Sequence, residues 1–154
     1  MEKQLTIAYK EFTLAELDTE DRQLLDAAIE ATDTAYAPYS SFHVGAALLL
    51  DDGTIVKGSN QENIAYPSGL CAERTALFAS GVSHQGKAVR KLAIIARNPD
   101  GELVAALPCG ACRQVMAEQQ MRQNSPIRVF CYMTESKILV FDGIESLLPF
   151  GFGM

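Results

Sequence analysis

The sequence predicts an α/β fold, a three-layer αβα sandwich around a mixed five-stranded sheet. Patterns typical of helices and strands follow one another in the order α-β-β-α-β-α-β-β-α over 154 residues, which favours one sheet with helices on both faces. Several expected strands are continuous apolar runs, as in sheets that are covered on both faces. Neither a repeat nor a linker interrupts the pattern, so we expect residues 1–154 to form a single domain.

The first long helix is expected over residues 14–36. Asp18 or Thr19 is suited to cap its start, acidic residues occupy its first turn, and Pro38 closes it. Its apolar stripe recurs at helical spacing and consists of Leu24, Leu25, Ala28, Ile29 and Ala35. The pattern therefore predicts a helix that packs on the sheet with one face.

Five apolar segments are expected to form the sheet. Asp52-Gly53 is a turn dipeptide between the first two, which therefore form a β-hairpin. The expected strands cover residues 44–50, 54–58, 89–98, 127–133 and 137–142.

Three further helices are expected after the hairpin, over residues 71–80, 110–120 and 143–149. The first of them should stop near Gly81, and Pro108 precedes the second. Residues 1–13 lie outside this arrangement. Their alternation of apolar and polar residues predicts an extra edge strand.

Charge and hydropathy exclude several classes of protein. The formal net charge is −6, and the 13 Lys and Arg residues are scattered among 19 acids. A protein that binds RNA or DNA polymers would normally show a basic stripe. The N-terminus lacks the apolar core of a signal peptide, and the longest apolar run, "VGAALLL", is far shorter than a membrane span. We therefore expect a cytoplasmic protein that binds neither nucleic-acid polymers nor membranes.

Three of the four cysteines indicate a zinc site. In a reducing compartment cysteines serve as metal ligands, nucleophiles or core residues more often than in disulfides. Cys109 and Cys112 form a Cys-x-x-Cys pair, and Cys71 stands 38 residues before them at the start of another expected helix. Three protein ligands leave one coordination position of a tetrahedral zinc open, as a catalytic site requires. Cys-x-x-Cys by itself also occurs in thiol oxidoreductases.

The charge of such a site would have to be compensated. Three thiolates on Zn²⁺ leave one net negative charge, which weakens the metal's ability to acidify water. Two helix N-termini directed at the sulfurs place partial positive charge there. Arg74 and Arg113 are expected to donate hydrogen bonds to the thiolates and to withdraw further charge.

Glu73 is the candidate for proton transfer. A carboxylate beside an activated water can act first as general base and then as general acid. Because Glu73 is two residues after Cys71, both side chains can face one cavity only at the very start of a helix. The alternative is a first-turn acid that merely interacts with the helix dipole.

Two segments, "NQENIAYPSGLCAERTALFA" and "PCGACRQVMAE", resemble the cytidine deaminase family, in particular its small homotetrameric branch. The resemblance extends from about residue 37 to about residue 152. It implies a cytidine deaminase-like fold, one Zn²⁺ per subunit held by Cys71, Cys109 and Cys112, and Glu73 as the residue that moves a proton to N3 of cytosine and later to ammonia.

The resemblance also implies roles in substrate binding. Asn60 and Glu62 correspond to residues that hold the ribose 3′-hydroxyl, and Phe42 to the aromatic that packs on the pyrimidine. The remaining correspondences are the backbone of Ala72 at the base edge, Tyr66 near the nucleoside at a subunit boundary, and Phe152 as a residue inserted into a neighbouring subunit's site. For Phe152 the alternative is a frayed apolar terminus.

The expected activity is hydrolytic deamination of cytidine and 2′-deoxycytidine to uridine and 2′-deoxyuridine, with release of ammonia, in pyrimidine salvage. One alternative is a deaminase of another cytosine nucleoside, such as blasticidin S. A second alternative is a non-catalytic zinc-binding domain, which would usually have a fourth Cys or His ligand. Cys131, in an expected strand, is predicted to be a buried, inert thiol.

Overall fold

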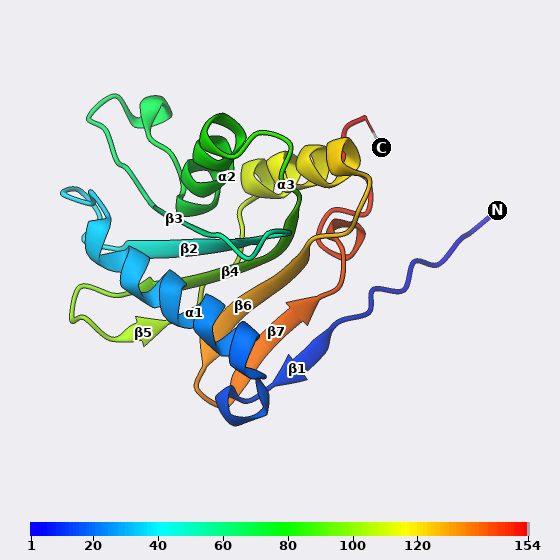
Figure 1. Cartoon of the computed structure of the whole chain (residues 1–154), viewed down its shortest axis with the longest axis horizontal. Coiled ribbons are helices and arrows are strands. Elements are labelled where there is room, and N and C mark those ends of the chain that lie inside the picture. Colours follow the sequence, from blue (N-terminus) through cyan, green and yellow to red (C-terminus); the bar gives the residue numbers. More distant parts are fainter. Residues whose placement is uncertain (154) are drawn as a thin grey trace.

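The computed structural model, which describes residues 1–153, contains one mixed sheet with helices on both faces (Figure 1). The strand order is β1-β7-β6-β4-β2-β3. The short strand β5 pairs with the last residues of β4, Ala96 and Arg97, beyond the part of β4 that pairs with β6. The strands are β1 (Lys10–Phe12), β2 (His43–Leu50), β3 (Ile55–Ser59), β4 (Val89–Arg97), β5 (Leu103–Val104), β6 (Arg128–Thr134) and β7 (Lys137–Phe141). The helices are α1 (Thr19–Ala31), α2 (Ala72–Ser83) and α3 (Gly110–Gln123).

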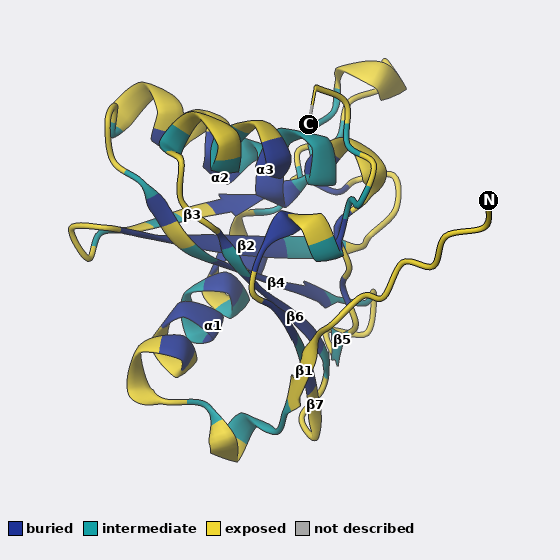
Figure 2. Ribbon diagram, turned by 90° about the vertical axis from the view of Figure 1, so that its right-hand side faces the viewer, coloured by how far each residue is buried: buried dark blue, intermediate teal, exposed yellow. Residues whose placement is uncertain are grey.

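The three layers are visible when the sheet is viewed along its edge. Helix α1 covers one face, and α2 and α3 lie together on the other (Figure 2). Only β4 and β6 run parallel, and the other pairs are antiparallel. The predicted α/β class and the mixed sheet are therefore confirmed.

The sheet has seven strands instead of the predicted five. The additional strands are β1, which pairs with β7 at the edge, and β5, which pairs with β4. The edge strand expected within residues 1–13 is thus confirmed over three residues. Strand β5 was missed because two residues are too few to show an alternating pattern.

The first helix is shorter than its apolar pattern predicts. Asp18 caps α1, and its carboxylate accepts a hydrogen bond from the amide of Asp21 at 2.8 Å. The regular helix ends at Ala31, and a 3₁₀ turn follows over Thr32–Thr34. The hydroxyl of Thr32 donates to the carbonyl of Ile29 at 2.6 Å, and such side-chain bonds compete with helical ones.

Helix α2 continues through Gly81 to Ser83, so the expected end at Gly81 is wrong. Gly81 is exposed and a β-carbon there would meet no atom within 4 Å. A helix tolerates glycine at such a surface position at a cost of about 1 kcal/mol. Helix α3 ends at Gln123, three residues later than predicted, and Asn124 follows in the left-handed conformation with φ of 51°. The expected final helix is a 3₁₀ turn over Ile144–Ser146.

Two glycines allow the helices to approach the hairpin from opposite sides. A β-carbon on Gly45 would come within 1.9 Å of the Ala28 carbonyl oxygen in α1. A β-carbon on Gly58 would come within 2.5 Å of the Ala72 carbonyl oxygen in α2. The start of α2, which carries the candidate site, therefore packs directly against β3.

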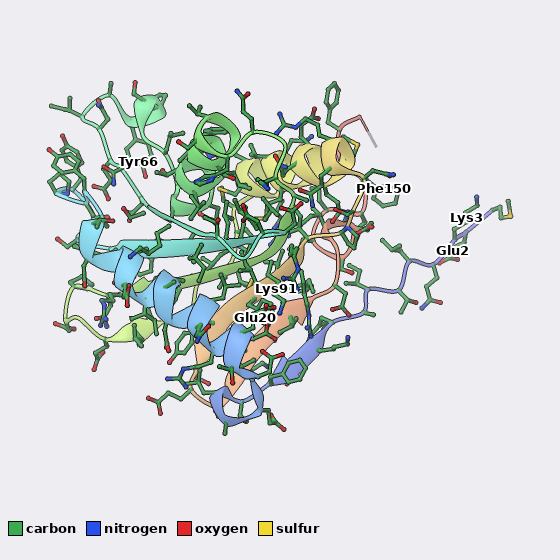
Figure 3. The ribbon with its side chains drawn as sticks, in the orientation of Figure 1. Glu2, Lys3, Glu20, Tyr66, Lys91 and Phe150 are labelled. Carbon is green, nitrogen blue, oxygen red and sulfur yellow. The ribbon has the colours of Figure 1, made fainter. Side chains whose placement is uncertain are left out.

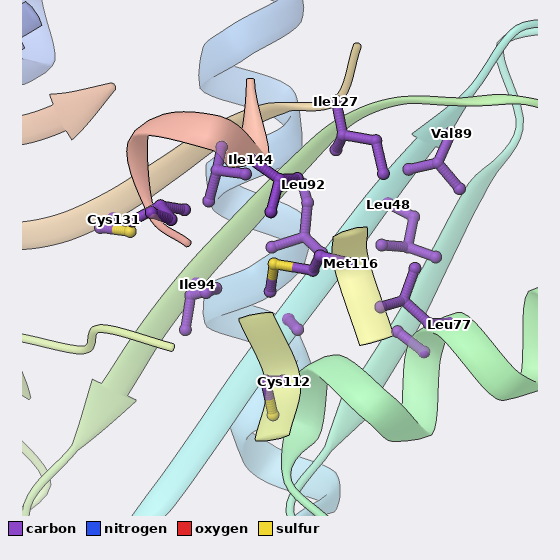
Figure 4. Packing of buried hydrophobic residues seen from close by; sticks show 14 of the residues in the cluster. Leu48, Leu77, Val89, Leu92, Ile94, Cys112, Met116, Ile127, Cys131 and Ile144 are labelled. Carbon is purple, nitrogen blue, oxygen red and sulfur yellow. The ribbon is translucent and has the colours of Figure 1, made fainter. Parts of the chain in front are cut away.

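The sheet separates two apolar cores. The core under α1 includes Leu24, Leu49 and Phe130. The other core includes Ile94, Met116 and Cys112, so a candidate zinc ligand is part of the packed interior (Figure 4). Because α2 and α3 both pack on this core, their N-termini hold fixed positions relative to each other.

Residues 1–9 extend away from the body of the protein and are exposed, as the positions of Glu2 and Lys3 show (Figure 3). The Tyr9 ring lies 5.9 Å from that of Phe141. Within the described residues, no helix combines the length and the apolar character that crossing a membrane requires.

Candidate metal centre and substrate cavity

The three cysteines predicted to bind zinc lie together at the N-termini of two helices. Cys71 is the N-cap of α2, Cys109 is the N-cap of α3, and Cys112 lies in the first turn of α3. The sulfur of Cys109 is 3.8 Å from that of Cys71 and 3.5 Å from that of Cys112. All three sulfurs lie within 4.8 Å of one another.

This arrangement fits a zinc ion. Thiolates at the usual Zn–S distance of about 2.3 Å on a tetrahedral centre are separated by roughly 3.8 Å. Two of the three sulfur separations, at 3.8 and 3.5 Å, are close to that value, and the third is within 4.8 Å. Among residues 1–153 the cluster contains three potential ligands, Cys71, Cys109 and Cys112. Cys131, the remaining thiol, is fully buried within β6, as predicted.

The neighbouring charges stabilise negative sulfur. The pKa of Cys71 is lowered to about 5, first by the thiol of Cys112 and then by Arg74. Nη2 of Arg74 lies 3.6 Å from the Cys71 sulfur. The pKa of Cys112 is raised, because it is the hydrogen-bonded and buried partner of Cys71. The surroundings of Cys71 therefore favour its thiolate form.

Arg113 does not make the contacts expected of it. Its Nε donates to the Pro108 carbonyl at 2.9 Å, and its Nη1 donates to the Leu147 carbonyl at 2.9 Å. The predicted hydrogen bond from this guanidinium to a cysteine sulfur is absent from the described residues. Because Arg113 follows Cys112 on a helix, its side chain is directed to a different side, and there it ties the start of α3 to the C-terminal segment.

Glu73 lies beside the sulfurs and is almost fully buried, with 4% of its surface exposed. Burial raises the pKa of its carboxyl to about 7, and the negative charge of Cys71 contributes. It lines the same cavity as Cys71 and Cys109. The requirement that both side chains face one cavity from the very start of a helix is therefore met.

The cavity has a volume of about 470 Å³, which suits a small organic molecule. It brings together residues from four separate parts of the chain. Those predicted from the sequence are Phe42, Asn60, Glu62, Tyr66, Cys71, Ala72, Glu73, Arg74 and Cys109. Those that the sequence did not indicate include Ser40, Ile94 and residues 105–107.

Asn60 and Glu62 are both bonded to the segment that carries Phe42. Oδ1 of Asn60 accepts from the Val44 amide, and its Nδ2 donates to the Phe42 carbonyl, each at 2.8 Å. The Glu62 carboxylate accepts hydrogen bonds from the Tyr39 amide at 2.9 Å and from the Ser40 amide at 3.3 Å, and a further one from the Ser40 hydroxyl.

Tyr66 lies at the exposed mouth of the cavity, and Ala72 lies at its buried end. Tyr66 is in the 3₁₀ turn Tyr66–Ser68 and is 86% exposed, on a loop that projects from the body (Figure 3). Ala72 is fully buried at the first residue of α2. The cavity therefore extends from an aromatic at its mouth to the buried start of a helix.

Phe152 is not among the residues that line this cavity, and its side chain is 87% exposed. Its backbone is nevertheless held by Gln114 of α3. The Gln114 amide group donates to the Phe152 carbonyl at 3.1 Å and accepts from the Phe152 amide at 3.0 Å. The terminal aromatic is thus anchored to α3 through its backbone and is directed outward.

The chain is similar to proteins of one family. Residues 18–125 match the family model "Cytidine and deoxycytidylate deaminase zinc-binding region". The chain is 50% identical over 101 residues to a cytidine deaminase of Halalkalibacterium halodurans, covering 64% of this chain and 71% of that protein. It is 42% identical over 114 residues to a cytidine deaminase of Mycobacterium tuberculosis, covering 72% and 82% respectively.

A solved structure shares the fold. The crystal structure of cytidine deaminase from Burkholderia pseudomallei superimposes with a TM-score of 0.72 at 36% identity, over 84% of this chain and 97% of that one.

Proposed function

Because the chain belongs to the cytidine and deoxycytidylate deaminase family, we propose that it deaminates cytidine and 2′-deoxycytidine by hydrolysis, giving uridine and 2′-deoxyuridine with release of ammonia. The observation that carries this proposal is the buried carboxylate of Glu73 beside three clustered thiols, in a cavity that Glu73, Cys71 and Cys109 line. A structural zinc site would be closed by a fourth ligand. The cavity instead reaches Cys71 and Cys109 directly.

Cys71, Cys109 and Cys112 would hold one zinc ion per subunit. When bound, zinc acts as a Lewis acid that makes a water molecule nucleophilic at neutral pH. Arg74 and the N-termini of α2 and α3 offset the extra negative charge of three thiolates. In this proposal Arg113 supports the site indirectly, because it fixes the start of α3 through the Pro108 carbonyl.

Glu73 transfers the protons. It accepts one proton from the attacking water at a carboxylate oxygen and delivers it to N3 of the cytosine ring. The oxygen of that water bonds to C4. The hydroxyl proton then passes by way of Glu73 to the amino group, the C4–N4 bond breaks, and ammonia leaves. Burial of Glu73 excludes bulk water, which would otherwise compete for these protons.

The remaining cavity residues would bind the nucleoside. Phe42 packs on the pyrimidine, Asn60 and Glu62 hold the ribose, and the backbone of Ala72 contacts the base edge. Tyr66 lies at the mouth, where it can contact the sugar. All of these residues line one cavity with Glu73.

The assembly is part of the proposal. An exposed Phe152 anchored by Gln114 is suited to enter the site of a neighbouring copy. We propose that a single domain over residues 1–154 forms a homotetramer with shared sites. The expected context is pyrimidine salvage in the cytoplasm.

Ammonia release from cytidine by the zinc-loaded protein tests the proposal. The wild type should be active, and Glu73→Gln should lose about 10²- to 10⁴-fold in kcat while keeping its zinc, because general acid–base catalysis is removed. Glu118→Gln, an exposed carboxylate on α3, is the control and should stay active. A wild type that holds zinc but turns over only another cytosine nucleoside, such as blasticidin S, would contradict the choice of substrate. Activity that persists after zinc is stripped would contradict the metal mechanism.

A further inference from the structure

The segment that carries Phe42 is supported by a short extended stretch, residues 60–62. The Tyr36 amide donates to the Asn60 carbonyl at 3.0 Å, and the Glu62 amide donates to the Tyr36 carbonyl at 2.8 Å. On its other side, Gln61 exchanges two hydrogen bonds with Leu70, each at 2.9 Å. These hydrogen bonds on both sides fix the backbone of residues 60–62, whose side chains bond to the segment that carries Phe42.

The backbone of Phe42 is held at both ends by side chains. Nδ2 of Asn60 donates to its carbonyl at 2.8 Å, and Oγ of Ser40 accepts from its amide at 3.1 Å. The Ser40 hydroxyl in turn donates to Oε1 of Glu62. A serine hydroxyl has one proton to donate, so the donor and an acceptor position of Ser40 are both engaged.

Packing alone does not determine where Phe42 lies. Its side chain is 37% exposed, and it belongs to neither of the two apolar cores. The adjacent Ser41 has φ of 54°, a left-handed conformation that L-residues other than glycine adopt only at some cost. Hydrogen bonds must therefore keep this turn in its observed shape, and those of Ser40 span it.

We propose that Ser40 is a positioning residue that couples sugar recognition to base recognition. It joins Glu62, which would hold the ribose, to the backbone of Phe42, which would pack on the pyrimidine. The inference rests on the proposed deamination of cytidine, since it assigns Ser40 a part in binding that substrate. Ser40 acts through Phe42, and the chemistry of proton transfer is left to Glu73.

The coupling predicts a specific kinetic change. Removal of the Ser40 hydroxyl leaves the Phe42 amide and one Glu62 oxygen without their partner, so the aromatic ring is no longer held in place. The ring contacts the base in both the ground state and the transition state, and such uniform binding appears in KM. We expect Ser40→Ala to raise KM for cytidine roughly tenfold, with kcat within about twofold of the wild type.

The test is a double-mutant cycle on the zinc-loaded protein, with Ser40→Ala, Phe42→Ala and the double variant assayed for KM and kcat. If Ser40 acts through Phe42, Ser40→Ala should raise KM no further in the Phe42→Ala background. Ser40→Thr, which keeps the hydroxyl, should restore KM to near the wild-type value. Ser68→Ala is the matched control, because Ser68 is exposed on the opposite loop and is not among the cavity residues.

Three results would overturn the inference. The first is an equal rise in KM on Ser40→Ala with and without Phe42, because this would make the two residues independent. The second is a rise in KM accompanied by a fall in both kcat and zinc content, which would indicate general damage to the metal site. The third is an unchanged KM. A wild type without cytidine turnover in the same assay would overturn the proposed function itself, so the two failures are distinguishable.

Discussion

The side-chain amide of Gln114 hydrogen-bonds to both the amide and the carbonyl of Phe152, at 3.0 and 3.1 Å. The last described turn is thereby attached to the helix that carries Cys109 and Cys112, while the Phe152 ring is 87% exposed. An exposed aromatic whose backbone is anchored is suited to a pocket on another molecule.

From this relationship we predict that Gln114→Ala and Phe152→Ala each raise KM for cytidine, Phe152→Ala by about tenfold, since an aromatic contact with the nucleoside is lost. Zinc content should stay unchanged, because neither side chain is a ligand. Combining the two changes should add little, which steady-state kinetics can establish. Unaltered KM in Phe152→Ala would contradict the assignment of a shared site.

Arg74→Ala should lower kcat by 10- to 100-fold, a typical effect of losing a partner of a metal ligand. The reason is that Nη2 of Arg74 is hydrogen-bonded to the Cys71 sulfur at 3.6 Å and offsets its charge. The measurement is kcat per bound zinc, with zinc quantified in the same sample. Equal losses of activity and zinc would argue against charge compensation.

Arg113→Ala is the contrasting variant. Because this guanidinium donates to the carbonyls of Pro108 and Leu147, its loss should reduce the free energy of unfolding by about 1–3 kcal/mol. Thermal unfolding of the zinc-loaded Arg74→Ala and Arg113→Ala proteins would distinguish the role of Arg113 in stability from the role of Arg74 in activity.

Gly58→Ala should destabilise the protein by about 1–3 kcal/mol, because the new β-carbon would come within 2.5 Å of backbone atoms of Ala72 and Ala76. The start of α2 would have to shift, so activity should fall as well. Gly81→Ala in the same helix is the control. Its β-carbon meets nothing within 4 Å, and it should stabilise the protein by about 0.5–1 kcal/mol. Denaturant unfolding of both variants provides the comparison.

The loop that carries Phe42 should loosen at acidic pH. The hydrogen bond from Ser40 holds the pKa of Glu62 below its ordinary value of 4.5. A carboxyl with a lowered folded-state pKa contributes stability that is complete above 4.5 and is lost as the pH falls through the folded value. The difference in melting temperature between wild type and Glu62→Gln should therefore be constant above that pH and shrink below it. A difference that grows with acidification would contradict this sign.

Local sequence patterns were sufficient to predict the helices and strands whose sequences are long, periodic or capped. Asp18 was identified as one of two candidate caps, with Thr19, because its side chain and the acids after it are a local signal, and the structure selects Asp18. The signals failed where tertiary contacts compete. Helix α2 passes Gly81 since packing of its buried face outweighs one exposed glycine, and β5 forms because β4 offers it an edge.

The residues of the candidate site were likewise predictable from the sequence only in part. Residue types at short spacing, such as Cys71 with Glu73 and Cys109 with Cys112, were sufficient to predict which side chains gather at the candidate site. Ser40 was missed because a serine in a loop has no pattern of its own, and its significance arises only from contact with Glu62, 22 residues away. Arg113 was misjudged because adjacency in sequence does not determine which way a helical side chain points.

The sequence by itself therefore determined the α/β class, the family resemblance and the two short motifs that contain three cysteines and one glutamate. The class depends on periodicity, and the motifs depend on residue types at short spacing within single segments. The tertiary structure decided which arginine contacts a thiol, that Ser40 links Glu62 to Phe42, and that Gln114 holds Phe152. Each of these pairs joins side chains or backbone groups whose approach depends on how helices and loops pack against one sheet, and packing is a property of the whole chain.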